Sequence, residues 1–317
     1  MKTILKLCAA VSAVIFATFS LADTYALNIG ISDYPDVVDE NGDPYLDENG
    51  DPISDDLFGC VNDAKLYKKL LMEKYGVPEE NIRMLLDKDA NEEKFIEALR
   101  WLLETARPGD TVFISFSGHG AQYAVDDQPE EEDGLEEVLV LYDTLVTDDF
   151  INDLNKLFVD TGRNTVFVMD SCYSGGISRG GGDGKLLGKK WRSTRDRWTD
   201  GERLRKAKSH GMFTAREESA LLNAVRKPRS IEKGSFVFVM AGQEDQTTSD
   251  VQFVDDDPPA QGIFTFVFVI ILMDDPSLSI EEAIETVKYA LKDADFDQVP
   301  KFEASDSARP TKPLLGG

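Results

Sequence analysis

Apolar residues along this chain fall into two kinds of pattern that alternate with one another. Continuous runs rich in Val, Ile and Phe predict buried strands at residues 25–31, 111–117, 138–142, 165–170 and 235–240. Between these runs, apolar residues recur every three or four positions, which predicts amphipathic helices. Strands that alternate with helices at this spacing predict an α/β fold with a mostly parallel central sheet flanked by helices.

Polar residues mark where the expected helices begin. Asn91 and Thr147 each precede an amphipathic stretch whose first turn is acidic, so each is expected to cap a helix. Ser279 and Glu282 have the spacing of a capping box for the last helix. The almost wholly apolar run at 262–273 predicts a buried helix that is too short to cross a membrane.

The chain changes character after the strand predicted at 165–170. Residues 179–229 hold 15 Lys and Arg against six Asp and Glu and show no periodicity, which predicts a long loop or linker. We therefore divide the chain that follows residue 22 into a large region at 23–178, a basic linker or insertion at 179–234, and a smaller region at 235–317. The last residues of the smaller region are expected to form an extended tail.

The first 22 residues predict a secretory signal peptide. Lys2 and Lys6 make the start positive, residues 7–19 are almost wholly apolar, and residues 20–22 form a small-x-small cleavage site. A membrane anchor is the alternative, but the apolar run is too short to span a bilayer comfortably. We expect an exported protein, periplasmic or secreted, that keeps no membrane span once the signal is removed.

The formal net charge of −25 narrows the class of partner. Nucleic acid is excluded because phosphate binding requires a basic face, whereas an acidic protein attracts basic peptides. Part of the charge comes from a repeat at 39–52, whose Asn-Gly and Asp-Pro steps predict a solvated surface loop. An acidic surface protein that binds Ca²⁺ through this repeat is an alternative, although the spacing is not that of an EF-hand.

Two of the predicted strands end in residues that can act together as nucleophile and base. The strand at 111–117 is followed by His119, and the strand at 165–170 is followed by Cys172, 172 − 119 = 53 residues later. If the strands are parallel neighbours, both side chains emerge at the edge of the sheet where open α/β folds place their active sites. A thiol beside an imidazole is a nucleophile beside its base. The chain's other histidine, His210, has no strand before it.

This order and spacing resemble the caspase-like cysteine peptidases, and the local motifs resemble their metacaspase branch. The motifs that carry the resemblance are Ser117–Gly120, Asp170–Gly175, Gly59–Ala64 and Gln298–Pro300. The resemblance implies a caspase-like three-layer sandwich and a cysteine endopeptidase with His119 and Cys172 as its dyad. The backbone N–H groups of Cys172 and Gly120 are the expected donors to the oxyanion.

The resemblance also implies a substrate class. Asp63 and Asp170 match the residues that line the metacaspase pocket for Arg or Lys at P1, the residue before the cleaved bond. A carboxylate pair suits a guanidinium or ammonium group. Ser117 is expected to touch the substrate, and Cys60 is expected to lie close to the active site. For Asp63 the alternative is a charge that only stabilises a helix N-terminus.

Many metacaspases require Ca²⁺, so the resemblance bears on cofactors too. Asp148 and Asp149 match ligand positions of the family's calcium site, and Asp133 matches a third. The position of a fourth aspartate is occupied here by Arg179, and a cation opposes metal binding. We therefore predict that no cofactor is required, with Ca²⁺ dependence as the alternative.

The expected dyad and the basic segment each allow a second interpretation. The main rival to a peptidase is a catalytically silent caspase-like protein that serves as a binding protein or scaffold, although both dyad residues are present. In an oxidising compartment, Cys60 and Cys172 could instead form a disulfide. A peptidase that cuts after Arg or Lys should also cut its own basic segment, at sites such as Lys190, Arg192, Arg205 or Lys208. A solvated basic loop that only balances charge is the second interpretation of that segment.

Overall fold

The computed structural model describes residues 22–35, 43, 46, 50, 56–124, 135–171, 186–191, 232–243, 246, 248–253, 259–306 and 309–315. In these residues a central six-stranded sheet has the strand order β12-β9-β7-β3-β1-β2. All of its neighbours pair in parallel except β12, which is antiparallel to β9. The bounds are β1 Thr24–Gly30, β2 Ile82–Leu86, β3 Thr111–Ser117, β7 Asn164–Asp170, β9 Phe236–Met240 and β12 Lys301–Ala304.

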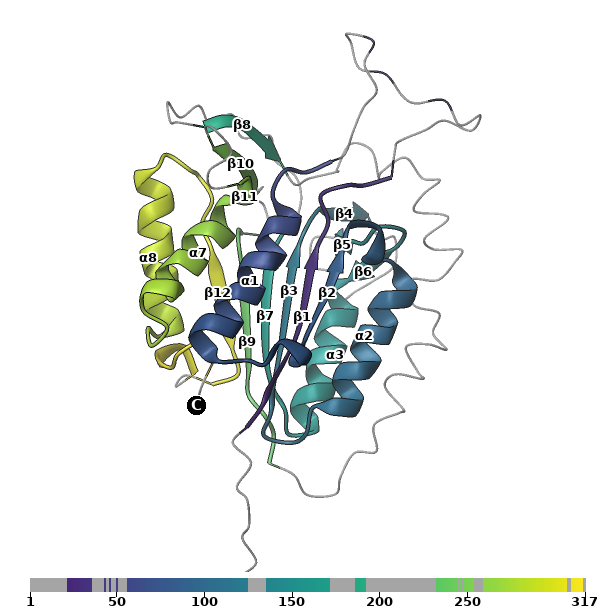
Figure 1. The fold of residues 1–317 in the computed structure, drawn as a ribbon, viewed down its shortest axis with the longest axis vertical. Coiled ribbons are helices and arrows are strands. Elements are labelled where there is room, and N and C mark those ends of the chain that lie inside the picture. Colours follow the sequence, from purple (N-terminus) through teal and green to yellow (C-terminus); the bar gives the residue numbers. More distant parts are fainter. Residues whose placement is uncertain are drawn as a thin grey trace, which may run out of the picture.

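Helices cover both faces of this sheet (Figure 1). One face carries α1 (Cys60–Tyr75), α7 (Ile263–Asp274) and α8 (Ile280–Asp293), and the other carries α2 (Glu92–Thr105) and α3 (Asp148–Asp160). Successive strand residues serve opposite layers. Phe113 packs on the side of α1, α7 and α8, while its neighbours Val112 and Ile114 pack on the side of α2 and α3. The predicted α/β fold with a mostly parallel, doubly covered sheet is confirmed.

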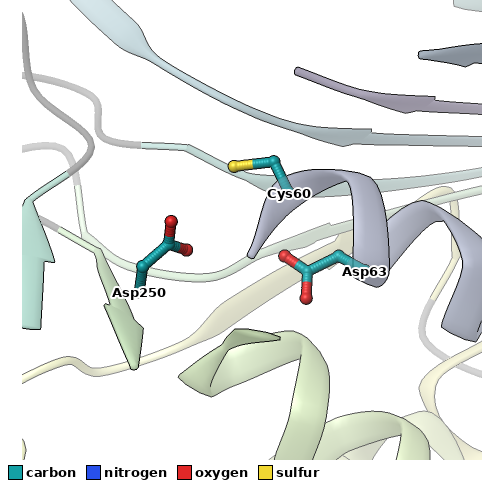
Figure 2. Close-up of side chains that lie close together, drawn as sticks. All are labelled: Cys60, Asp63 and Asp250. Atoms are coloured by element: carbon teal, nitrogen blue, oxygen red, sulfur yellow. The ribbon is translucent and has the colours of Figure 1, made fainter. Parts of the chain in front are cut away.

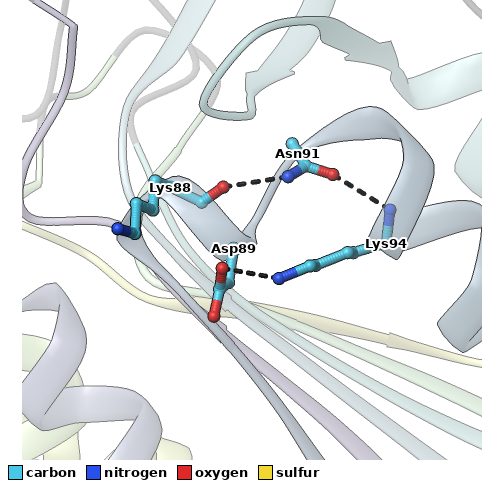
Figure 3. Close-up of polar contacts among 4 residues, drawn as sticks. All are labelled: Lys88, Asp89, Asn91 and Lys94. Carbon is cyan, nitrogen blue, oxygen red and sulfur yellow. Dashed lines mark hydrogen bonds and ion pairs between the residues drawn. The ribbon is translucent and has the colours of Figure 1, made fainter.

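The predicted start of α2 at Asn91 is confirmed. The Asn91 side chain accepts a hydrogen bond from the Lys94 backbone N–H at 3.0 Å and donates one to the Lys88 carbonyl oxygen at 2.9 Å. Across the same turn, the Lys94 ammonium pairs with Asp89 at 2.6 Å (Figure 3). This short polar segment therefore satisfies the Lys94 N–H locally. The first N–H of the helix, that of Glu92, donates instead to the Asp143 carboxylate, 51 residues away, at 2.9 Å.

The predicted starts of α3 and α8 are confirmed as well. The Thr147 hydroxyl accepts a hydrogen bond from the Phe150 backbone N–H at 3.2 Å. Ser279 and Glu282 form a capping box in which each side chain accepts from the other's backbone N–H. At the other end of α1, Gly76 has φ +66°, the left-handed conformation that commonly ends a helix.

Smaller antiparallel sheets lie beyond the carboxyl ends of the parallel strands, at the top of Figure 1. Within the described ranges, one contains β4 (Gly120–Ala124), β5 (Leu135–Val140) and β6 (Leu145–Thr147), and the other contains β8 (Leu186–Trp191), β10 (Ser249–Phe253) and β11 (Gln261–Gly262). Short 3-10 helices occupy Glu79–Asn81, Asp87–Asp89 and Arg309–Thr311.

The structure differs from the sequence prediction in several segments. Strand β2 was not predicted, and the strand predicted at 138–142 belongs, as β5, to an antiparallel sheet rather than to the parallel one. Strand β8 lies in the expected linker, where its backbone pairs with the antiparallel edge that β10 provides. The C-terminal segment is not an extended tail, because β12 pairs with β9 at the edge of the central sheet. The buried Arg309 guanidinium then donates to the carbonyl oxygens of Pro313 and Leu314, each at 2.8 Å. Neither β8 nor the C-terminal segment shows a periodic apolar pattern, so the sequence alone does not predict that these segments pair with other strands.

Some predictions concern residues that the structure does not describe. The signal peptide, most of the acidic repeat at 39–52, and most of the basic segment are among them. The predicted helix at 262–273 is confirmed as α7, but Ile270 is 48% exposed, so this helix is not buried on every side. In the described part of the chain, no helix combines the length and apolar character needed to cross a membrane.

Candidate active site

The histidine strand and the cysteine strand are neighbours, as the hypothesis of a dyad requires. β3 and β7 pair in parallel, with Ser117 in register with Asp170 at their carboxyl ends. The Gly118 backbone N–H donates to the Asp170 carbonyl oxygen at 3.3 Å, so the two segments leave the sheet side by side. His119 follows directly and is 3% exposed. Cys172, two residues beyond Asp170, lies outside the described residues.

Contacts with Val140 and Tyr34 hold His119. Its carbonyl oxygen accepts from the Val140 N–H at 3.0 Å, and its own N–H donates to the Tyr34 hydroxyl at 2.9 Å. The Tyr34 ring lies 4.7 Å from the imidazole, measured between ring centroids, at an interplanar angle of 48°. Tyr34 was not predicted from the sequence, because a tyrosine in a polar turn gives no sign of what it contacts.

Asp63 lies in the first turn of α1 and is fully buried. One carboxylate oxygen accepts from the Ser117 hydroxyl at 2.6 Å, and the other accepts from the Gly262 backbone N–H at 2.8 Å. Gly262 is the N-cap residue of α7. Asp63 therefore joins the end of the histidine strand to the start of α7, and Ser117 is a direct partner of this carboxylate.

Asp170, at the end of β7, is 1% exposed and turns toward the same helix. Its Oδ2 accepts from the Thr265 hydroxyl at 2.6 Å and from the Thr265 backbone N–H at 3.2 Å. Thr265 belongs to the first turn of α7. The N-terminus of a helix carries partial positive charge and stabilises nearby anions. The structure thus brings Asp63 and Asp170, both predicted to bind substrate, to one helix end.

A further buried carboxylate, Asp250 in β10, was not predicted. Its Oδ2 accepts from the backbone N–H groups of Phe58 and Gly59, just before α1, at 2.8 and 3.0 Å. Figure 2 shows Asp250 beside Cys60 and Asp63, and one ligand-type atom from each lies within 4.8 Å of the others. The sequence holds no signal for this contact, because Asp250 and Gly59 are 191 residues apart.

The described aspartates that the resemblance matched to a calcium site do not belong to the cluster around Cys60. Asp148 and Asp149 occupy the first turn of α3, and Asp133 lies outside the described residues. Burial raises the pKa of Asp148; the Asp149 N–H opposes this shift and the Asp149 charge reinforces it. Among residues that the structure describes, the group of candidate metal ligands is the one around Cys60, which does not include these aspartates.

Gly120 begins β4, opposite Leu139 in β5. The adjacent pair, His119 and Val140, is linked by the Val140 N–H bond to His119. Hydrogen-bonded and non-bonded pairs alternate along an antiparallel ladder, so the Gly120 N–H points away from β5. That direction is a requirement for a backbone donor to a reacting oxygen.

Comparisons with known proteins point to one family. Residues 26–179 match the family model described as metacaspase, peptidase C14 domain. The chain is 38% identical to Metacaspase-6 of Arabidopsis thaliana over 128 residues, which cover 38% of this chain and 34% of that relative. It is 27% identical to Metacaspase-1 of Cryptococcus neoformans var. neoformans serotype D over 278 residues, which cover 78% of this chain and 59% of the relative.

A solved structure has the same fold. The crystal structure of a protein from Geobacter sulfurreducens matches with a TM-score of 0.61 at 19% sequence identity, covering 92% of this chain and 97% of that one. Identity this low bears on the fold alone. The chain spans 34% to 59% of the length of the two metacaspases compared above. The region matched by the family model contains His119, Asp63 and Asp170.

Proposed function

We propose that this chain is a cysteine endopeptidase that hydrolyses peptide bonds after Arg or Lys, since residues 26–179 match the family model of the metacaspase peptidase domain. The parallel pairing of β3 with β7 carries the proposal. It supports a Cys172–His119 dyad, since residues that follow neighbouring parallel strands share one edge of the sheet. Open α/β folds bind their ligands at that edge.

In the proposed mechanism Cys172 is the nucleophile and His119 is the base. An ordinary thiol has a pKa of about 8.5 and is mostly protonated at neutral pH. His119 takes this proton and the thiolate sulfur attacks the scissile carbonyl carbon. The C–N bond then breaks to leave a thioester, and His119 returns the proton to the departing amine. Water, losing a proton to His119, attacks the thioester and releases the acid and the thiol.

The negative oxygen of each tetrahedral intermediate requires hydrogen-bond donors that are already in place. The Gly120 N–H is directed away from β5 by the alternation of the ladder, which supports a role as one donor. The Cys172 N–H is the second donor in this proposal. Glycine at 120 suits the role because no side chain limits how closely the reacting carbonyl can approach.

The proposed preference for a basic P1 residue rests on Asp63 and Asp170. Asp170 ends the cysteine strand, and Asp63 accepts from Ser117 at the end of the histidine strand. Both carboxylates face the start of α7. A buried carboxylate interacts strongly with a guanidinium because little water screens the pair. Ser117, which donates to Asp63, would hold that carboxylate in place while it binds the substrate.

Self-processing in the basic segment follows from this specificity, although one of the expected sites lies in a strand. Lys190 lies in β8, in backbone register with Asp250. A bond held in a sheet cannot enter an active site until the strand unpairs. We therefore propose cuts after Arg192, Arg205 or Lys208. Denaturing gels should show two fragments from the wild type and none from Cys172→Ala; a full-length wild type that cleaves Arg peptides contradicts processing alone.

Export and independence from metal complete the proposal. The signal pattern in the first 22 residues supports export. The mechanism above uses only side-chain and backbone groups, so EDTA should leave peptide hydrolysis unchanged. Activity that appears only with added Ca²⁺ contradicts this part of the proposal.

Hydrolysis of fluorogenic peptides tests the peptidase itself. Wild type, Cys172→Ala and His119→Ala are compared on peptides with Arg, Lys or Asp at P1. Only the wild type should turn over the Arg and Lys peptides, while circular dichroism shows the same fold in all three proteins. Activity that survives in Cys172→Ala rules out the proposed nucleophile. A preference for Asp at P1 rules out the proposed pocket.

A further inference from the structure

We propose that Tyr34 is a positioning residue for His119: its hydroxyl is inserted into the β4–β5 ladder at the pair His119–Val140 and sets the direction of the imidazole. The inference rests on the proposed function, since it concerns how the proposed base is aimed. Tyr34 is 5% exposed and lies in the turn after β1. It contacts neither substrate nor sulfur in this proposal and acts through His119.

The hydrogen bonds of the ladder reveal the insertion. Gly120 opposes Leu139, so the preceding antiparallel pair is His119 with Val140. A regular pair of this kind exchanges two direct N–H···O bonds. One is direct, from the Val140 N–H to the His119 carbonyl oxygen at 3.0 Å. The other runs through Tyr34: the His119 N–H donates to the hydroxyl at 2.9 Å, and the hydroxyl donates to the Val140 carbonyl oxygen at 3.1 Å.

A hydroxyl between donor and acceptor opens one side of the pair. A direct bond would hold the His119 nitrogen about 2.9 Å from the carbonyl oxygen of Val140. Two bonds in series hold these atoms further apart, so the strand splays at His119. Local widening of a ladder re-aims the side chain at that position, as a β-bulge does. The Tyr34 ring, 4.7 Å from the imidazole, also restricts its rotation.

Gly118 makes room for the inserted hydroxyl. A Cβ atom at this position would lie 2.6 Å from the Tyr34 hydroxyl oxygen and 2.9 Å from the Phe116 ring. Any side chain at 118 would therefore push the hydroxyl out of the ladder. The inserted Tyr34 hydroxyl therefore explains why residue 118 is a glycine, and no contact between Gly118 and the substrate is needed for this explanation.

The turn that carries Tyr34 is itself held firmly. The Ile31 N–H donates to the Ser117 carbonyl oxygen at the end of β3, at 3.0 Å. The N–H groups of residues 32 and 33 both donate to the Asp87 carboxylate, at 2.8 and 3.0 Å. The Tyr34 N–H donates to Asp56 at 3.0 Å. Consecutive backbone donors are thus fixed from the end of β1 to Tyr34. The hydroxyl is mounted on a rigid support, as precise placement of a base requires.

The test is Tyr34→Phe, which removes the hydroxyl and keeps the ring, with Tyr75→Phe as the matched control. The Tyr75 hydroxyl also donates to a carbonyl oxygen, that of Pro276 at 3.4 Å, but it belongs to the C-terminal end of α1. For an Arg peptide, kcat should fall about 10- to 100-fold in Tyr34→Phe with KM little changed, because a misplaced catalytic group costs about that much. Tyr75→Phe should keep the wild-type kcat.

Alkylation of Cys172 by iodoacetamide, followed by mass spectrometry of its peptide, separates positioning from folding. A well-aimed His119 supplies thiolate at neutral pH, so the ratio of the neutral to the alkaline rate should fall in Tyr34→Phe. If Tyr34→Phe lowers only the melting temperature and keeps the wild-type kcat and rate ratio, the positioning role is overturned. If Cys172→Ala still cleaves peptides, the proposed function is overturned instead.

Discussion

The helices of this protein begin in two different ways. The starts of α2, α3 and α8 each have a side-chain cap from their own segment: Asn91, Thr147 and Ser279 each accept from a backbone N–H three residues further on. In α2 the distant Asp143 adds an acceptor for the Glu92 N–H. The helices α1 and α7 begin after Gly59 and Gly262, which have no side chain to offer. Carboxylates from distant parts of the chain reach the backbone donors at those starts.

These distant carboxylates join the two regions on either side of the basic segment. Asp250 is 191 residues from Gly59, Asp63 is 199 residues from Gly262, and Asp170 is 95 residues from its partner in α7. A locally capped helix can begin to form on its own, whereas α1 and α7 obtain these acceptors only in the assembled domain. The helices next to the candidate active site are therefore the ones that have no side-chain cap from their own segment.

The largest expected effect concerns the carboxylates at the start of α7, which we propose bind the substrate as well as capping the helix. Asp63→Asn keeps the size of the side chain and removes its charge. If Asp63 binds the substrate cation, kcat/KM for an Arg peptide should fall, because a charge pair loses one member. The loss corresponds to about 2–5 kcal/mol of transition-state stabilisation. A citrulline peptide, which has the shape of arginine without its charge, should be affected little. Asp170→Asn is expected to behave in the same way.

The citrulline peptide is the control that separates charge recognition from folding. An equal loss of kcat/KM for both peptides would mean that Asp63 serves only to hold α1, β3 and α7 together. The contrast between the two groups of helices would then concern stability alone.

Asp250→Ala should have the next largest effect, on stability. It removes the acceptor for the backbone N–H groups of Phe58 and Gly59. Loss of a buried acceptor lowers the free energy of unfolding by about 1–3 kcal/mol, measurable by urea denaturation. The preference for Arg over citrulline should stay at the wild-type value. A loss of preference as large as in Asp63→Asn would show that these carboxylates act as one unit.

Removing a local cap should have a smaller effect. Ser279→Ala is expected to cost about 1 kcal/mol of unfolding free energy. Hydrogen bonds from Ser279 also lower the pKa of Glu282. A lowered pKa means that this carboxylate contributes stability above its ordinary pKa and loses the contribution as pH falls through the lowered value. Glu282→Gln should therefore destabilise the protein at neutral pH and have no effect in strong acid; an equal effect at both would exclude the charged cap.

The smallest expected effect is that of Asp148→Asn in α3. Burial raises the pKa of Asp148, so its charged form costs stability once the pH rises through the raised value. Removing the charge should stabilise the protein at neutral pH by about 0.5 kcal/mol or less. Added Ca²⁺ should shift the melting temperature of neither protein. A rise with Ca²⁺ in the wild type, absent in the variant, would establish a calcium site at this helix start.

The features that could be predicted from the sequence have short-range signals. Continuous apolar runs predicted β1, β3, β7 and β9 of the parallel sheet but not β2, whose run at Ile82–Leu86 is short and interrupted by Arg83. Asn91, Thr147 and Ser279 each stand a few residues from the groups they cap. His119 could be singled out because a buried strand ends just before it. Tyr34 and Asp250 could not, since each acts on a backbone segment more than 80 residues away, 85 for Tyr34 with His119 and 191 for Asp250 with Gly59.

The pairing of strand β8 affects whether the two fragments of a self-processed chain stay together. Its backbone lies before the proposed cleavage sites and pairs with β10, which lies after them. The parallel pairing of β7 with β9 crosses the same break within the central sheet. A cut after Arg205 would thus yield two polypeptides that share two sheets and remain one particle in native size-exclusion chromatography. Once denatured and separated, each half would lack the strands that template the other, so refolding would require both.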